Sequence, residues 1–86
     1  MARYEIVIRR SAYKDLRAIP NADVKKILNR IDSLADDPRG PGCEKLSTDE
    51  RYRVRQGNYR IIYSIEDDRL IVTIVKVGHR RDVYDR

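Results

Sequence analysis

The hydrophobic residues of this chain change their spacing once, and that change limits the fold more than any other feature. Between residues 11 and 35 they recur at three- and four-residue intervals, the period of an amphipathic helix. From residue 51 onward they alternate, the period of a half-buried strand. The segment DDPRGPG at residues 36–42 separates the two parts, because proline and glycine disfavour both structures.

The N-terminal part is predicted to form one strand and a helical hairpin. Residues 3–9 alternate apolar and mostly charged side chains, as a half-buried strand does. Ser11 is predicted to cap a first helix, which Pro20 ends. Asn21 is predicted to cap a second helix that stops at the loop 36–42. The hairpin should cover one face of a sheet and leave the other face available.

The C-terminal part is predicted to be an antiparallel meander of three strands. Tight turns join them, one at Gly57-Asn58 and one at the acidic residues 66–68. The expected strands are residues 52–54, 58–65 and 69–77. One strand, a helical hairpin and three antiparallel strands make an α+β fold, and the length of 86 residues indicates a single domain, 1–86.

The charge of the chain is basic and unevenly distributed. Residues 51–86 carry nine basic against five acidic residues, whereas residues 1–50 are nearly balanced. Fourteen of the nineteen basic residues are arginine, whose planar fork matches phosphate, so a nucleic-acid partner is favoured over a merely solubilising surface. The single cysteine, Cys43, excludes an internal disulfide and a Cys-rich zinc site. No signal peptide or membrane-spanning run is found, so a cytoplasmic protein without membrane partners is expected.

The segment RYRVRQGNYR at residues 51–60 concentrates arginine on one predicted face. A two-residue turn at Gly57-Asn58 would place Arg55 directly opposite Arg60. Arg53 and Arg51 continue the same face, while the residues between them point to the core. Solvent screening alone could make such crowding tolerable. The other interpretation, which we favour, is an anion site that holds the phosphates of RNA or DNA.

Four residues of the C-terminal tail can approach the same face. They are His79, Arg80, Arg81 and Tyr84. Tyr84 could stack on an exposed base, although packing on its own domain is an equally good explanation. No Gly-rich phosphate loop and no Cys/His cluster are present, so neither a mononucleotide site nor a metal site is predicted, and no cofactor is expected.

The motifs YRVR, GNYRIIY and VGHRRDVY, in this order and spacing, resemble the RelE family of toxins from type II toxin–antitoxin systems. The preceding helical hairpin, which ends in DDPRG, is similar too, so the resemblance covers nearly the whole chain. It implies the fold of small microbial ribonucleases. It also implies a ribosome-dependent endoribonuclease that needs no metal, cleaves messenger RNA in the ribosomal A site and is neutralised by a cognate antitoxin.

The resemblance assigns roles to five residues of this chain. The strand lysines of the family fall on Arg53 and Arg55, and the phosphate-binding arginine falls on Arg60. The general-acid arginine falls on Arg80, and the base-stacking tyrosine falls on Tyr84. Further contacts with messenger or ribosomal RNA are expected from basic residues beside this set, namely Lys45, Arg51 and Arg81.

The arginines at positions 53 and 55 depart from relatives that have lysine there. Arginine essentially cannot lose its proton, so Arg55 is expected to stabilise the transition state electrostatically rather than act as a base. His79 is the only histidine, and histidine changes charge near neutral pH, so it is a candidate for acid–base work; a surface histidine without such a role is the alternative.

Two other functions remain open at the level of sequence. The ParE-like branch shares the fold but targets DNA gyrase, and it usually lacks the basic set that this chain keeps. A nucleic-acid-binding module without chemistry would bind phosphates with a strong salt dependence and leave no cleaved product.

Overall fold

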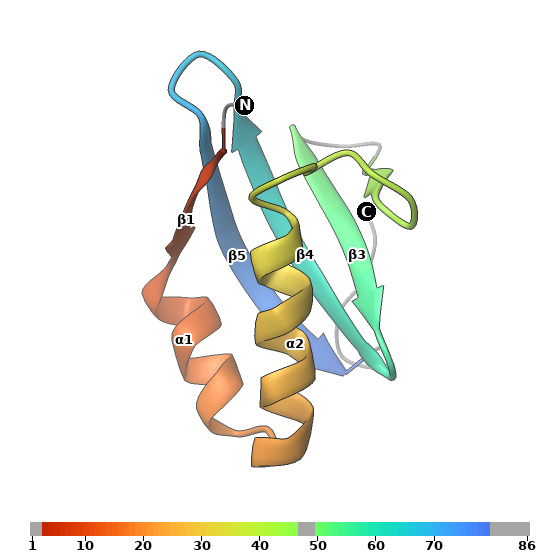
Figure 1. Ribbon diagram of the computed structural model, residues 1–86. Coiled ribbons are helices and arrows are strands. Elements are labelled where there is room, and N and C mark those ends of the chain that lie inside the picture. The colour runs from red at the N-terminus through yellow and green to blue at the C-terminus, as the bar shows by residue number, and fades with distance from the viewer. Residues whose placement is uncertain (1–2, 47–49, 80–86) are drawn as a thin grey trace.

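The computed structural model describes residues 3–46 and 50–79. Two helices lie side by side on one face of a five-stranded sheet (Figure 1). In chain order the elements are β1 Glu5–Ile8, α1 Arg10–Arg17, α2 Asn21–Ser33, β2 Glu44–Lys45, β3 Arg51–Gln56, β4 Tyr59–Glu66 and β5 Ile71–His79. The predicted α+β fold, with its N-terminal strand, helical hairpin and antiparallel meander, is confirmed.

The strands are ordered β1-β5-β4-β3-β2 across the sheet. The meander β3–β4–β5 is antiparallel, and β1 pairs with β5 in parallel, with Glu5 beside Ile71. Parallel pairing needs a crossover connection, and here the chain crosses over through the helical hairpin and the meander. The short strand β2 pairs with β3 at the other edge and was not predicted.

The core lies between the helices and the sheet, as the two hydrophobic periods predict. Apolar side chains of both helices pack on those of the three meander strands. The fully or nearly buried set is Ala12, Leu16, Ile27, Ile31, Leu34, Val54, Ile61, Tyr63, Val72, Ile74 and Val77. Neither helix of the described part of the chain is long and apolar enough to cross a membrane.

Both predicted helix caps are wrong. Helix α1 begins at Arg10, before Ser11, and Arg9 occupies the N-cap position without a side-chain hydrogen bond. Helix α2 begins at Asn21 itself, because Pro20 has an extended backbone and takes the N-cap position. The carbonyl of Pro20 accepts the first backbone hydrogen bonds of α2, so a side-chain cap at Asn21 is not needed.

Ser11 instead helps to hold α1 against an irregularity in β5. Ile62 of β4 faces Lys76 and Tyr63 faces Ile74, so Val75 is an extra residue, a β-bulge. The Ser11 hydroxyl donates to the Val75 carbonyl at 3.0 Å. Beyond the bulge the alternation of β5 shifts by one residue, so that Val77, which is buried, faces the core.

Candidate nucleic-acid interface

The β3–β4 hairpin has the predicted register. Gly57 has a φ of +61°, which fits the first central position of a type II′ turn, and Gln56 pairs with Tyr59. Arg55 therefore lies directly opposite Arg60. Such partners share a face, with Cβ atoms roughly 5 Å apart. The hairpin thus places two guanidinium groups at the same point of the sheet.

This arginine pair lies on the face that the helices do not cover. On β3 and β4 the residues that alternate with the arginines, Tyr52, Val54 and Ile61 among them, pack against the core. Because successive side chains of a strand point to opposite faces, Arg55 and Arg60 point away from the helices. We call the face that carries Arg51, Arg53, Arg55 and Arg60 the arginine face. Arg55 is exposed, and Arg51 and Arg60 are half-buried.

Arg53 differs from its neighbours because it is buried, with only 7% of its surface exposed. Its guanidinium forms an ion pair with the carboxylate of Glu44 on β2. The register explains the contact, since Glu44 lies directly opposite Arg53. The Glu44 side chain itself is 66% exposed. Burying a charge costs free energy unless it is paired, so Glu44 makes the buried position of Arg53 tolerable.

Glu44 was not among the site residues predicted from the sequence. The available signal was an acidic residue between the loop 36–42 and the arginine-rich strand. A two-residue strand has no hydrophobic period, however, so its pairing with β3 could not be read from the pattern.

His79 lies apart from the arginine pair. It is directly opposite Tyr59 in the sheet, and their rings meet edge to face with centroids 5.8 Å apart. Tyr59 packs against the core, so His79 shares the helix side of the sheet. There it lines a groove together with Asp15 and Ile19 of the helical hairpin. The structure therefore separates His79 from Arg55 and Arg60 by the thickness of the sheet.

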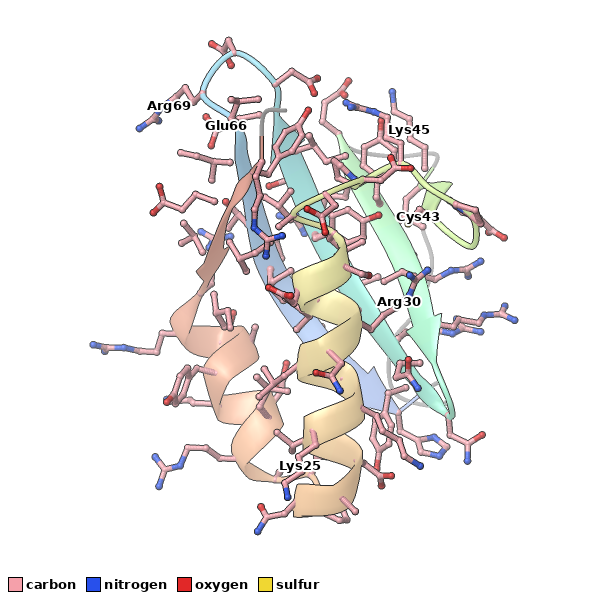
Figure 2. All side chains as sticks on the ribbon, viewed as in Figure 1. Lys25, Arg30, Cys43, Lys45, Glu66 and Arg69 are labelled. Carbon is pink, nitrogen blue, oxygen red and sulfur yellow. The ribbon has the colours of Figure 1, made fainter. Side chains whose placement is uncertain are left out.

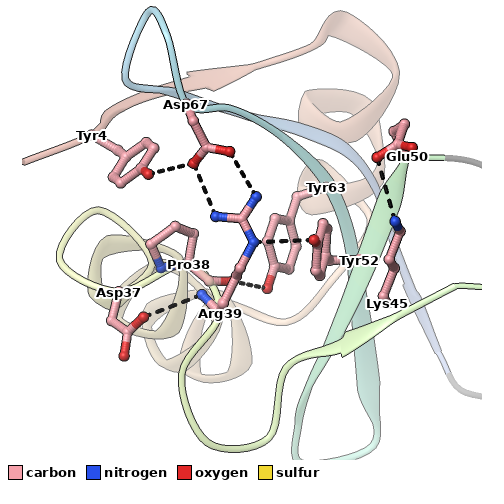
Figure 3. Close-up of polar contacts among 9 residues, drawn as sticks. All are labelled: Tyr4, Asp37, Pro38, Arg39, Lys45, Glu50, Tyr52, Tyr63 and Asp67. Atoms are coloured by element: carbon pink, nitrogen blue, oxygen red, sulfur yellow. Dashed lines mark hydrogen bonds and ion pairs between the residues drawn. The ribbon is translucent and has the colours of Figure 1, made fainter.

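The other candidate residues fall into two groups. Arg51 lies opposite Ser64 and continues the arginine face. Lys45 lies opposite Tyr52, so its strand position belongs to the helix side, and its Nζ is 3.5 Å from the Glu50 carboxylate (Figure 3). The tail candidates Arg80, Arg81 and Tyr84 lie outside the described residues.

A polar cluster around Arg39 fixes the loop that leads to β2 (Figure 3). Both terminal nitrogens of Arg39 donate to the Asp67 carboxylate at 2.9 Å, and its Nε donates to the Tyr52 hydroxyl at 3.1 Å. The Tyr4 hydroxyl donates to the same carboxylate at 2.7 Å. These hydrogen bonds, those from Arg39 first, hold the pKa of Asp67 at about 2. This cluster was not predicted from the sequence; it joins Tyr4, just before β1, to the loop and the β4–β5 turn.

Two further hydrogen bonds anchor the same loop. The hydroxyl of the buried Tyr63 donates to the Pro38 carbonyl at 2.6 Å, and burial raises the pKa of Tyr63 far above its usual value. Arg30 of α2 donates to the Pro41 carbonyl at 2.9 Å, and Figure 2 shows Arg30 beneath the loop. These contacts hold the loop in one conformation, and the loop therefore positions Glu44 on the arginine face.

The arginine face can bind anions and stabilise negative charge. Guanidinium groups are donors only, and a pair of them matches the oxygens of a phosphodiester. Among the described residues no group of three or more His, Cys, Asp or Glu side chains is placed to hold a metal ion. The geometry suits the recognition of a phosphate by charge and hydrogen bonds.

Known proteins share both the sequence and the fold. Residues 6–84 match the family described as the ParE toxin of the type II toxin–antitoxin system parDE. The chain is 31% identical to the putative toxin RelE1 of Methanocaldococcus jannaschii, covering 95% of this chain and 96% of that protein. It is 26% identical to a putative RelE-like toxin protein of Escherichia coli, covering 96% of this chain and 92% of that one. Its fold superimposes with a TM-score of 0.85 on a chain of the toxin–antitoxin complex RelBE2 of Mycobacterium tuberculosis, at 26% identity, covering 95% of this chain and 97% of that one.

Proposed function

The chain belongs to the ParE toxin family, within the RelE/ParE superfamily of type II toxin–antitoxin systems, and from this premise we propose that it is a messenger RNA endoribonuclease. The proposed reaction takes place in the A site of the ribosome. The 2′-hydroxyl of one nucleotide attacks the adjacent phosphate, which leaves a 2′,3′-cyclic phosphate and a 5′-hydroxyl. The cut removes the message from translation.

One observation carries this proposal: Arg55 and Arg60 are direct cross-strand partners on the arginine face. Like charges in this position destabilise a sheet, and the core on the other face does not depend on them. A phosphodiester between the two guanidinium groups would place negative charge between them and accept hydrogen bonds from both. The pair is therefore best explained by an anionic substrate.

The two arginines would act mainly on the transition state. Attack at phosphorus concentrates negative charge on the non-bridging oxygens, and fixed cations beside them lower the barrier. In the same proposal Arg80 protonates the leaving oxygen and Tyr84 stacks on a base, as the family resemblance implies. Arg51 and Arg81 would contact neighbouring parts of the message or ribosomal RNA, whereas Lys45, on the helix side of the sheet, would contact ribosomal RNA rather than the bound message.

The ribosome has a defined part in this proposal. A message held in the A site has its 2′-hydroxyl already aligned for in-line attack, and orientation of this kind can supply roughly 7–11 kcal/mol. The toxin then adds charge stabilisation. We therefore expect negligible cutting of free RNA at toxin concentrations that cut ribosome-bound message efficiently.

We also propose that a cognate antitoxin neutralises the protein. The similar chain from Mycobacterium tuberculosis was crystallised in a toxin–antitoxin complex. A partly disordered acidic segment could fold over the basic surface of this chain and block access of RNA. The net charge of +5 favours such a partner.

The test is to map the 5′ ends of cellular messages after induction of the parent protein, Arg60→Ala and Arg80→Ala. New 5′-hydroxyl ends within translated codons are expected for the parent and should nearly vanish for both variants. In parallel, purified parent protein is given ribosome-bound and free message at equal concentration. Equal cutting of both RNAs would contradict the role of the ribosome, and no cutting of either would reject the endoribonuclease.

The family match favours a second candidate, inhibition of DNA gyrase, because its description is that of the ParE toxin. The described arginine pair argues for RNA cleavage instead, but the fold alone does not decide. A supercoiling assay with purified gyrase distinguishes the two. Loss of supercoiling together with intact messages would support gyrase as the target.

A module that binds RNA without cutting it is the third outcome of these assays. It would bind message with a steep salt dependence and yield no cyclic-phosphate ends. The substitution Arg60→Ala would then weaken binding, and no catalytic rate would exist to be lost.

A further inference from the structure

The arginine face needs a proton acceptor that arginine cannot supply. The attacking 2′-hydroxyl must lose its proton, and a guanidinium cannot accept it, because it is already protonated at any pH that a folded protein tolerates. Donation of a proton to the strongly basic leaving oxygen, the role assigned to Arg80, is a separate step. His79 lies on the other side of the sheet, beside Tyr59. The acceptor is therefore to be sought among the described residues of the arginine face itself.

Glu44 is placed to fill this gap. It lies opposite Arg53, and Arg55 is the next residue of β3 on the same face. One strand spacing of about 4.8 Å and two residues of about 3.3 Å each separate the backbones of Glu44 and Arg55. Both side chains are long, so a phosphodiester bound between Arg55 and Arg60 has its ribose within reach of the Glu44 carboxylate.

The exposure of the ion pair supports the same assignment. Arg53 has 9% of its side chain exposed, whereas Glu44 has 66% exposed. A carboxylate offers two oxygens with several lone pairs, so an ion pair to Arg53 through Oε2 leaves capacity to accept a proton. The buried Arg53 fixes the direction of the carboxylate, and its open side faces the solvent from which RNA would arrive.

Two other described carboxylates share this face and are badly placed. Glu5 and Glu66 both lie beside Ile71, at the end of the sheet next to the β4–β5 turn. Figure 2 shows Glu66 there, beside Arg69 and far from the β3–β4 turn. Arg55 and Arg60 flank the β3–β4 turn. Position along the strands thus selects Glu44.

We propose that Glu44 is the general base of the cleavage reaction, an inference that rests on the proposed endoribonuclease function. The Glu44 carboxylate takes the proton of the 2′-hydroxyl while the bond from the 2′-oxygen to phosphorus forms. The bond from phosphorus to the 5′-oxygen breaks with its electron pair, and that oxygen takes a proton from the general acid assigned to Arg80. Solvent then removes the proton from Glu44 and returns one to Arg80, so that both groups regain their starting states, and no metal or redox partner takes part. Arg53 is a positioning residue in this scheme.

The experiment measures cleavage of ribosome-bound message against pH for the parent, Glu44→Gln, Glu44→His and the control Glu50→Gln. The Glu44→Gln side chain would keep the shape and a hydrogen-bond acceptor for Arg53 but cannot take a proton, so a loss of about 10²–10⁴-fold is expected. Glu50 is an exposed carboxylate 3.5 Å from Lys45, and its loss should leave the rate within about twofold, as most surface changes do.

The pH dependence of the cleavage rate of Glu44→His distinguishes a base at this position from a purely structural residue. Imidazole titrates about two pH units above a carboxylate. This variant should therefore recover part of the activity near neutral pH and lose it as the pH falls below about 6.5, because a protonated imidazole cannot accept the proton. Thermal unfolding of each variant, and its binding to a message with a 2′-deoxy nucleotide at the cleavage site, report whether folding and binding persist.

The outcomes separate this inference from the proposed function. If the parent cuts ribosome-bound message and Glu44→Gln cuts it equally well with the same pH profile, Glu44 is not the base, and the endoribonuclease still stands. If the parent cuts nothing, both are rejected. If Glu44→Gln unfolds, the pH profile of Glu44→His decides, because a profile that matches the parent contradicts a base at this position.

Discussion

The two faces of the sheet differ in burial and in charge. On the helix side, Ile61 and Tyr63 of β4 are fully buried in a continuous apolar core. On the arginine face, Arg60 of the same strand sits directly opposite Arg55. Folding explains the first face, since apolar burial is its main driving force. Apolar burial does not account for the arginines that lie opposite one another on the second face, which we propose binds phosphate.

The largest expected effect comes from a core residue. Ile61→Ala removes buried methyl and methylene groups next to Tyr63 and leaves a cavity, so we expect a loss of about 2–5 kcal/mol in unfolding free energy. Chemical denaturation measures this loss. The cleavage rate per folded molecule should change little, because Ile61 points away from the arginine face. A rate that falls while the stability stays unchanged would break the division between the faces.

Arg60, the preceding residue of the same strand, should show the opposite pattern. Arg60→Ala is expected to slow cleavage of ribosome-bound message about 10²–10³-fold, because it removes a cation beside the developing charge. The unfolding free energy should stay within about 1 kcal/mol of the parent. Single-turnover cleavage and denaturation of the same preparation measure both. A variant that is destabilised as strongly as Ile61→Ala would make Arg60 a structural residue.

The residues on the helix side of the sheet were easier to predict from the sequence than those on the arginine face. Those on the helix side follow the helical and strand periods, and Gly57 marks the turn that sets the β3–β4 register. The arginine pair could be predicted as well, because the register follows from that turn. The two helix starts could not, because Ser11 bonds to a bulge carbonyl distant in sequence and the Pro20 backbone replaces a side-chain cap. Local signals do not contain such long-range contacts.

The remaining parts of the candidate site depend on contacts distant in sequence. Glu44 reaches Arg53 only because a fixed loop brings a two-residue strand to the sheet edge. The bulge at Val75 shifts the alternation of β5, which puts His79 beside Tyr59 on the helix side. The sequence indicated basic residues and a histidine as candidates, but it could not show which face each one would share.

Substitution of Arg39 tests whether the loop 36–42, which Arg39 anchors on the helix side, positions Glu44 on the arginine face. Arg39→Lys keeps the charge but loses the two-pronged contact with Asp67 and the hydrogen bond to Tyr52. Because the pair is largely exposed, we expect a stability loss of only about 1 kcal/mol. The cleavage rate should fall by a small factor if the loop positions Glu44. Arg69→Lys, at an exposed ion pair in the neighbouring turn, is the control and should change neither quantity.

The smallest expected effect is a pH dependence of stability that originates at Asp67. Arg39 and Tyr4 hold its pKa at about 2, below the ordinary value of 3.8. The unfolded chain therefore binds more protons in this interval, so the contribution is complete above about pH 4 and is lost as the pH falls through 2. Denaturation of the parent and Asp67→Asn across this range should show a stability difference that shrinks with acidification. Asp68→Asn, in the same turn, is the matched control. A difference that stays constant with pH would show that Asp67 acts through packing, and the cluster would then not be held by its charge.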